Sequence, residues 1–279
     1  MLGLFSKYVY LGAAQRRLFQ HGPAILTYHR IGKAPPGAPD PFLYDTAREL
    51  DAHLTRAQEA GLKLVSLGEA VHQGNLRQGC LAVTFDDGCV SVLQEALPVL
   101  QKHKVRAIQF IVSGRIGGLN DWDLSKNDVP ERLMDKEQIR DWLAAGMEIG
   151  SHSHSHRNLR KLKSSEAREE IFGSKARLED VFGVAIHHFA FPYGGWRRSE
   201  VRDLVKQSGY ESAVTTAFGV GSASADLTRE AGYQSACTAD FGVSMDGAEL
   251  WSLRRITPLT GPELVHKVFH RLMRKVRGL

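Results

Sequence analysis

The chain has 279 residues, of which 43% are hydrophobic and 24% are charged, and its formal net charge is +5. This composition is ordinary for a globular enzyme with a large core, so stability requires neither disulfides nor a structural metal. Three cysteines without a repeated spacing argue against a disulfide framework and favour a reducing compartment. The positive charge suits a phospholipid surface or an anionic substrate, or is simply a solvated basic face. No interleaving of basic and aromatic residues indicates a nucleic-acid partner.

Residues 1–22 are predicted to form an N-terminal helical extension. Lys7 precedes a short charge-free stretch at 8–14, which is at the lower length limit of a signal-peptide core, and no clean cleavage site follows. No run reaches the ~18 apolar residues of a membrane span. We therefore interpret the segment as an amphipathic helix and expect a cytoplasmic protein, with secretion as the alternative.

Strand patterns alternate with helix patterns from residue 23 to residue 258. Apolar or alternating runs predict strands at 23–29, 62–67, 81–85, 105–112 and 188–191. A further short run at 147–150 leads into the histidine cluster. Between them, helical periodicity favours helices at 45–60, 90–103, 135–145 and 164–182. We expect Asp45 to cap the first of these helices and Ser165 to cap the last.

This alternation predicts an α/β fold built from parallel βαβ units. About seven such units without a glycine-rich phosphate fingerprint favour a single-domain (β/α) barrel over residues 23–258. Functional residues of such barrels gather at the carboxyl ends of the strands. An aspartate pair, a histidine cluster, a Pro-Tyr-Gly turn and His29 all follow predicted strands, so we expect them on one rim.

The most informative segment is Thr-Phe-Asp-Asp-Gly at 84–88, which ends a buried strand. Adjacent carboxylates repel each other, and a bound cation is the usual way to keep both ionised. Gly88 permits a sharp turn after the pair. The segment therefore predicts one aspartate on a metal and one free for proton transfer.

Ser151 to His156 contains a histidine at every second position. His152 and His156 are four residues apart, so on a helical turn their rings share a face, whereas His154 points elsewhere. Asp87 and these two imidazoles would leave coordination positions open, which is typical of catalytic metal sites. The donor set suits one divalent ion, with Zn²⁺ as first candidate and Co²⁺, Ni²⁺ or Fe²⁺ as alternatives. The alternative interpretation is a solvated, histidine-rich loop.

Three segments resemble motifs of the polysaccharide deacetylases, the NodB-homology or carbohydrate esterase family 4 group. They are the segment at 84–88, the pair His152 and His156 followed by Leu159, and Phe-Pro-Tyr-Gly at 191–194. The resemblance in order and spacing spans about residues 24–257. It implies a distorted (β/α) barrel and a metal-dependent removal of N-acetyl groups from amino sugars.

The same resemblance implies a role for each motif residue. Asp86 would be the general base, and Asp87, His152 and His156 would be the metal ligands. The backbone N–H of Tyr193 would donate to the oxyanion. Each role is chemically coherent, because a metal-activated water needs a base and the tetrahedral intermediate needs a hydrogen-bond donor.

The chain departs from the commoner family pattern in its third motif. There an arginine before Pro-Tyr-Gly holds the catalytic aspartate, but here Ala190 and Phe191 occupy that region. Arg255, in a predicted strand near the end of the barrel, is our candidate substitute. The alternative for Arg255 is a surface salt bridge.

The chain also lacks the C-terminal Leu-x-His motif that supplies the general acid. Instead it begins its barrel with Leu-Thr-Tyr-His-Arg-Ile at 26–31. This arrangement resembles the permuted branch of the family, similar to the poly-N-acetylglucosamine deacetylases, in which the histidine-bearing strand comes first. We therefore predict His29 as the general acid, with a purely structural histidine as the alternative.

Three further features invite functional interpretations. Trp122 and Trp196 lie in predicted rim loops, where they would stack on sugar rings or anchor packing. Residues 259–279 are predicted to form a C-terminal basic amphipathic helix. That helix would pack on the barrel or make a peripheral contact with an anionic inner membrane.

The sequence thus predicts a metal-dependent hydrolase that removes N-acetyl groups from amino sugars of a polysaccharide or glycan precursor. One alternative is a deformylase or deacetylase of a lipid-linked or nucleotide-linked amino sugar. Another is a catalytically degenerate carbohydrate-binding protein. The expected partner is an N-acetylated glycan or a lipid-linked sugar, and the sequence leaves the oligomeric state open.

Overall fold

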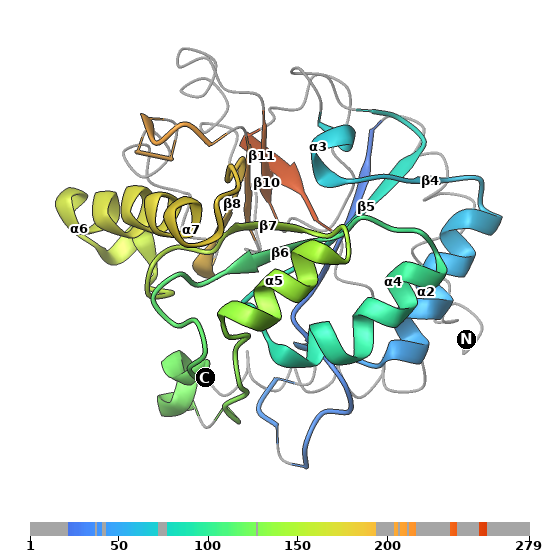
Figure 1. Ribbon diagram of the computed structural model, residues 1–279, viewed down its shortest axis with the longest axis horizontal. Helices are drawn as coiled ribbons and strands as arrows, with labels where there is room; N and C mark the ends of the chain where they lie inside the picture. The colour runs from blue at the N-terminus through green and yellow to red at the C-terminus, as the bar shows by residue number, and fades with distance from the viewer. Residues whose placement is uncertain are drawn as a thin grey trace, which may run out of the picture.

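A computed structural model describes residues 22–36, 38–40, 43–71, 77–126, 128–193, 204–205, 207–210, 212–215, 235–238 and 251–255. Within them, one sheet of nine parallel strands organises the fold (Figure 1). Its main path runs through β1 (Ala24–Tyr28), β5 (Cys80–Phe85), β6 (Ile108–Ile111), β7 (Glu148–Ser151), β8 (His188–Phe191), β9 (Ser212–Thr215), β10 (Ser235–Thr238) and β11 (Trp251–Arg254). The ninth strand, β4 (Lys63–Leu64), pairs with β5.

β5 has neighbours on both of its edges. Leu81 pairs with β1 and with Leu64 of β4, whereas Thr84 pairs with β1 and with Ile108 of β6. Because a residue has one partner strand on each edge, β4 and β6 share the edge opposite β1. A separate small sheet joins β2 (Arg30–Ile31) to β3 (Tyr44–Asp45).

The sheet curls until its last strand approaches its second. Arg255 follows β11 directly, and its guanidinium donates hydrogen bonds to Asp86, which follows β5. No pairing joins β11 to β1 within the described residues, where these two strands are the ends of the path. The α/β class with a parallel sheet is therefore confirmed, and the sheet forms a curled half-barrel within the described residues. Its closure into the predicted (β/α) barrel stays a prediction.

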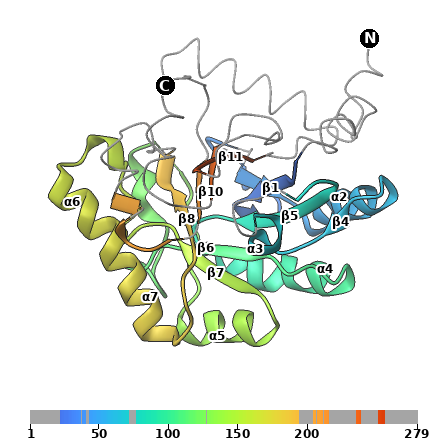
Figure 2. The same cartoon turned by 90° about the horizontal axis from the view of Figure 1, so that it is seen from above.

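Helices cover the outer face of the curled sheet. In Figure 2, α7 (Ser174–Phe182), α5 (Lys136–Ala144), α4 (Leu97–Lys102) and α2 (Ala47–Glu59) form an arc outside the strands. The other helical segments are α3 (Leu67–Ala70), η5 (Val92–Ala96), η6 (Asp121–Lys126), η7 (Leu159–Lys161), α6 (Ser164–Arg168) and η8 (Glu169–Gly173). Of these, η5 and η8 are π-helical turns that lead into α4 and α7.

Local hydrogen bonds move several predicted boundaries. Thr46, and not Asp45, caps α2 by forming a capping box with Glu49, because Asp45 is engaged in the β2–β3 pair. The predicted strand at 62–67 is shortened to β4, since Ser66 caps the short helix α3. The predicted cap Ser165 lies inside α6, which begins one residue earlier.

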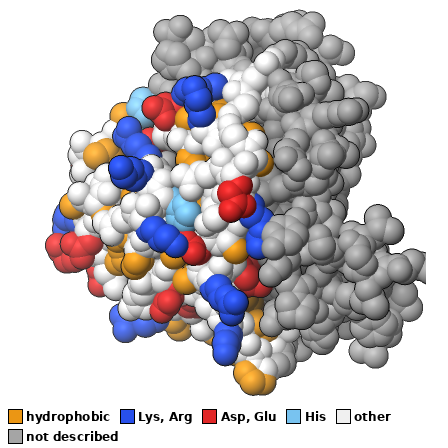
Figure 3. Space-filling model, turned by 90° about the vertical axis from the view of Figure 1, so that its right-hand side faces the viewer, with side chains coloured by type: hydrophobic (Ala, Val, Ile, Leu, Met, Phe, Trp, Pro, Cys, Tyr) orange, Lys and Arg blue, Asp and Glu red, His pale blue; other side chains and the backbone are white. Residues whose placement is uncertain are grey.

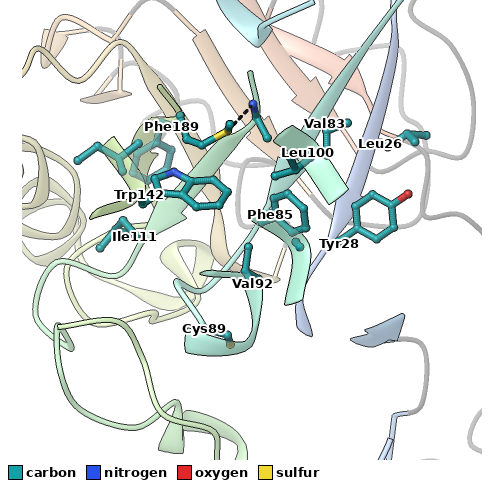
Figure 4. Close-up of a cluster of buried hydrophobic side chains, with 14 of the residues drawn as sticks. Leu26, Tyr28, Val83, Phe85, Cys89, Val92, Leu100, Ile111, Trp142 and Phe189 are labelled. Atoms are coloured by element: carbon teal, nitrogen blue, oxygen red, sulfur yellow. Dashed lines mark hydrogen bonds between the residues drawn. The ribbon is translucent and has the colours of Figure 1, made fainter. Parts of the chain in front are cut away.

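Both faces of the sheet are buried, as expected for parallel strands covered by helices. Along β1 and β5, alternate side chains such as Leu26 and Phe85 pack outward against the helices (Figure 4). Phe85 meets Trp142 of α5 edge to face, with ring centroids 6.2 Å apart. The intervening side chains, such as Ile25 and Ala82, form a second cluster inside the curl. This alternation places Thr84 and Asp86 on the inner side.

The surface is mixed in charge on the face that Figure 3 shows. Over the described part, basic and acidic side chains are interspersed with small apolar areas. In the part of the chain that the structure describes, no helix has the length and hydrophobicity needed to cross a membrane. Three predictions concern residues that the structure does not describe. They are the N-terminal extension, of which only residue 22 is described, the helix at 259–279, and the role of Trp196.

Candidate active site

The carboxyl ends of three strands bring four candidate residues to one rim. His29 follows β1, Asp86 and Asp87 follow β5, and His152 follows β7. The register of β1 with β5 extends one step further, because the Asp86 N–H donates to the carbonyl of Tyr28 at 2.9 Å. Asp87 then adopts a positive φ of 75°, which breaks the strand alternation. Two consecutive carboxylates can therefore face the same rim.

Asp87 lies against two imidazoles. Its Oδ1 is 3.5 Å from Nε2 of His152 and 3.3 Å from Nε2 of His156. One ligand atom from each of these three residues lies within 4.8 Å of the others, and all three side chains are buried. The structure thus assembles the predicted trio of possible metal ligands.

The predicted helical turn between the two histidines is wrong. The chain is not helical from 152 to 156, and Ser153 and His156 adopt positive φ angles of 64° and 59°. These two left-handed residues reverse the chain and aim both rings at Asp87. His154 turns away, and its Nδ1 lies 3.1 Å from the Ser113 hydroxyl.

The electrostatics of the trio suit a divalent cation. Nδ1 of His152 donates to the Ala190 carbonyl at 2.9 Å, which leaves the Nε2 lone pair directed toward Asp87. Burial lowers the pKa of His152 to about 4, so its imidazole is neutral. Burial alone would raise the pKa of Asp87, but the surrounding histidines, His156 first, hold it well below its usual value. One carboxylate and neutral imidazoles that converge in a buried site fit Zn²⁺ and similar ions.

Arg255 binds the carboxylate of Asp86. Nη1 and Nη2 of Arg255 donate to Oδ1 and Oδ2 of Asp86 at 2.8 and 2.7 Å, and both side chains are fully buried. Nη1 also donates to the Thr84 hydroxyl at 3.1 Å. Burial opposes ionisation of Asp86, but Arg255 reverses this effect and the pKa is lowered. The arrangement is a buried bidentate ion pair, which excludes the surface salt bridge considered for Arg255.

His29 and Tyr193 flank these groups. Nε2 of His29 is 3.7 Å from Oδ2 of Asp86, and the His29 side chain is 16% exposed. Tyr193 has a positive φ of 52°, and its ring meets the ring of His156 edge to face with centroids 4.8 Å apart. The Tyr193 hydroxyl donates to Asp123 at 3.0 Å. Three further candidates, His29, Tyr193 and Arg255, thus lie around the trio and its neighbour Asp86.

Trp122 has a neighbour that the sequence does not reveal. Its ring stacks on the imidazole of His156, with centroids 4.1 Å apart and planes inclined by 20°. This contact favours the packing interpretation of Trp122 and places the packed indole at the site itself. Asp123 is a functional candidate that sequence reasoning misses. Its position next to Trp122 is the feature of the sequence that could have pointed to it.

Glu170 is a second residue that sequence reasoning misses. Its Oε2 accepts hydrogen bonds from the N–H groups of His154 and Ser155 at 3.0 and 2.8 Å. Its Oε1 accepts one from the Ser155 hydroxyl. Glu170 is buried and lies in the π-helical turn η8, which changes the helical phase at this point. The Glu170 carboxylate therefore stabilises the strained loop at 152–156, which carries the two imidazoles.

Replacing Glu170 by Gln is expected to weaken metal binding by roughly tenfold to a hundredfold, the usual effect of losing outer support of a metal ligand. The amide carries no negative charge, so the charge-assisted hydrogen bonds that Glu170 accepts from the loop become weaker. Titration with a competing chelator measures the change. Glu169→Gln, at the exposed neighbour, is the control and should bind metal normally. Normal metal affinity in Glu170→Gln and Glu170→Ala would contradict the expectation.

Comparison with known proteins identifies the family. The model of the polysaccharide deacetylase family matches residues 73–213. The chain belongs to this family.

Individual relatives are distant in sequence. Bacillus subtilis YxkH is 26% identical over 202 residues, which are 71% of this chain and 66% of that protein. A bifunctional xylanase/deacetylase of Pseudobutyrivibrio xylanivorans is 24% identical over 62% of this chain and 27% of its own length. A poly-beta-1,6-N-acetyl-D-glucosamine N-deacetylase of Staphylococcus aureus is 24% identical, over 63% of this chain and 66% of its own length. The chain therefore covers no more than 66% of the length of any of these three relatives.

Solved deacetylase structures share the fold. IcaB from Ammonifex degensii superposes with a TM-score of 0.62 at 20% identity, over 89% of this chain and 95% of that one. Streptococcus pyogenes deacetylase PplD, in complex with acetate, gives the same TM-score and identity, over 88% and 97%. The likeness extends over most of both chains, so the curled parallel sheet is that of these deacetylases.

Proposed function

We propose that this polysaccharide deacetylase family member is a metal-dependent hydrolase that removes N-acetyl groups from amino sugars of a polysaccharide or glycan precursor. One observation carries the proposal. The trio of Asp87, His152 and His156 lies beside a second carboxylate, Asp86, which Arg255 fixes in its ionised form. A ligand set and a separate base on one rim are what hydrolysis of an amide by an activated water requires.

The three ligands would hold one divalent ion, with Zn²⁺ as first candidate. When bound, the ion supplies a Lewis acid that polarises the amide carbonyl and acidifies a water molecule. Asp86 accepts the proton of the attacking water, and the Arg255 fork fixes the plane of its carboxylate. The backbone N–H of Tyr193 donates to the oxyanion of the tetrahedral intermediate.

Collapse of the intermediate needs an acid, because an amine anion is a poor leaving group. His29 supplies this proton from Nε2, which lies at the Oδ2 side of Asp86. Asp86 and His29 therefore act as base and acid from adjacent positions, with Nε2 of His29 3.7 Å from Oδ2 of Asp86. Their side chains come from neighbouring strands β5 and β1, so the pairing of these strands sets the spacing.

The proposed substrate is a polymer or oligomer of an N-acetylated amino sugar. The name of the Staphylococcus aureus relative, which acts on poly-beta-1,6-N-acetyl-D-glucosamine, supports this choice. We thus propose both that the bound ion is Zn²⁺ and that the substrate is polymeric or oligomeric.

An acetate-release assay tests the function. N-Acetylglucosamine oligomers are compared with lipid-linked and nucleotide-linked N-acetyl and N-formyl sugars, using metal-stripped and metal-reloaded protein. We expect acetate from the oligomers, loss of activity after stripping, and recovery on reloading. Stoichiometric metal binding without acyl release from any substrate would instead indicate a carbohydrate-binding protein. Formate release, or acetate release only from linked sugars, would move the assignment to the alternative substrates.

A further inference from the structure

The two imidazoles of the candidate metal site are supported differently. His152 donates its Nδ1 proton to the Ala190 carbonyl, the usual way in which a metal-ligating histidine is oriented. His156 has no such support from the described residues, since its buried Nδ1 lacks a hydrogen-bond partner there. Its side chain is only 7% exposed, so the ring is nevertheless enclosed. Something other than a hydrogen bond to this ring must fix its plane.

Aromatic rings enclose His156. Trp122 lies nearly parallel to the imidazole, with centroids 4.1 Å apart and planes inclined by 20°. Tyr193 meets the imidazole edge to face, at 4.8 Å and 70°. A parallel ring on an imidazole restricts rotation about the terminal side-chain bond, which is otherwise soft.

A hydrogen bond links Tyr193 to the chain neighbour of Trp122. The Tyr193 hydroxyl donates to Oδ1 of Asp123, the residue that follows Trp122 in η6. Trp122, His156, Tyr193 and Asp123 therefore form a closed ring of contacts, which we call the His156 clamp. The clamp joins the loop after β6 to the turn after β8, with the imidazole between them.

We propose that Trp122 is a positioning residue for His156. Through the clamp it fixes the imidazole plane by packing, so that Nε2 stays directed at Asp87 and at a bound metal ion. The inference rests on the proposed metal site and adds a residue that does not coordinate the ion. It also revises the sugar-stacking interpretation, because His156 covers one face of the indole.

Metal affinity of Trp122 variants tests the inference. Trp122→Ala should raise the Zn²⁺ dissociation constant, measured by chelator competition, by roughly tenfold to a hundredfold. It should also change the visible absorption spectrum of the Co²⁺-loaded protein, which reports ligand geometry. Trp122→Phe keeps a ring and should retain most of the affinity. Leu124→Ala, at a side chain of the same η6 segment that is 53% exposed, is the matched control.

A second variant keeps the test decisive if Trp122→Ala unfolds. Tyr193→Phe removes only the hydroxyl that closes the clamp and should weaken Zn²⁺ binding by a smaller factor. Its effect should be less than additive with that of Trp122→Phe, because both act on one ring of contacts. Unchanged affinity and an unchanged Co²⁺ spectrum in folded Trp122→Ala, or in Tyr193→Phe if Trp122→Ala unfolds, would overturn the inference.

The wild-type protein separates this inference from the proposed function. If the wild type binds one metal ion and Trp122→Ala binds it equally well, only the clamp is refuted. If the wild type binds no divalent ion at all, the proposed function fails and the inference fails with it. Equal losses in Leu124→Ala and Trp122→Ala would also refute the clamp, because the effect would then not depend on the stacked ring.

Discussion

Asp86→Asn is expected to lower acetate release by roughly 10²–10⁴-fold, the contribution of a positioned general base. Asparagine has nearly the same shape but cannot accept the proton of the attacking water. Metal binding should persist, because the three ligands are unchanged and Asp86 is not among them. Initial rates of acetate release and metal content, measured on the same preparations, check both statements.

The control for Asp86→Asn must separate chemistry from stability. Asn keeps one oxygen for Arg255, but the buried guanidinium loses its counter-charge, and breaking a buried pair costs several kcal/mol. The thermal stability of each variant should therefore be measured alongside its rate of acetate release. Asp51→Asn, which breaks a solvent-exposed ion pair with Lys102, should change neither rate nor metal content. A metal-loaded, folded Asp86→Asn protein with full activity would refute the role of Asp86 as base.

His152→Ala is expected to abolish both metal binding and acetate release. The imidazole contributes one of the three ligand atoms that the described residues bring together, and its neutral Nε2 is held in place by the hydrogen bond to Ala190. We expect the metal dissociation constant to rise by roughly a hundredfold or more, because loss of outer support alone has an effect of up to that size. Chelator competition and elemental analysis of the purified protein measure the change.

His154→Ala is the matched control for His152→Ala. It removes an imidazole from the same loop, but one that contacts Ser113 and lies outside the ligand trio. Its metal content should equal that of the wild type. Retention of metal by His152→Ala, or an equal loss in His154→Ala, would show that the trio is not the binding site.

Patterns that are local in sequence predict the frame of this site well. The run before Asp86 forms β5, and the order of strands and helices predicts a parallel sheet with its carboxyl ends on one rim. The residue types of the first two motifs also predict the ligand trio. These features depend on short-range periodicity and on the chemistry of each side chain, and both can be read directly from the chain.

Predictions fail where neighbouring hydrogen bonds compete. A spacing of four predicts a helical turn between His152 and His156, but left-handed residues and the carboxylate of Glu170 produce a different loop. That carboxylate comes from a π-helical turn, which no periodicity reveals. Asp45 has the residue type of a helix cap, yet Thr46 takes this place because Asp45 pairs in the small sheet.

The sequence by itself determined the aspartate pair, the histidine pair and the strands that precede them, because each of these is a local pattern. It also named Arg255 as a partner for Asp86, but left a surface salt bridge open. Only the tertiary structure decided between them, by burying a bidentate contact between residues 169 positions apart. The stack of Trp122 on His156 likewise depends on the pairing of β6 with β7, which brings the loops after these two strands together. Contacts of this kind arise from long-range packing, and no periodicity in the chain encodes them.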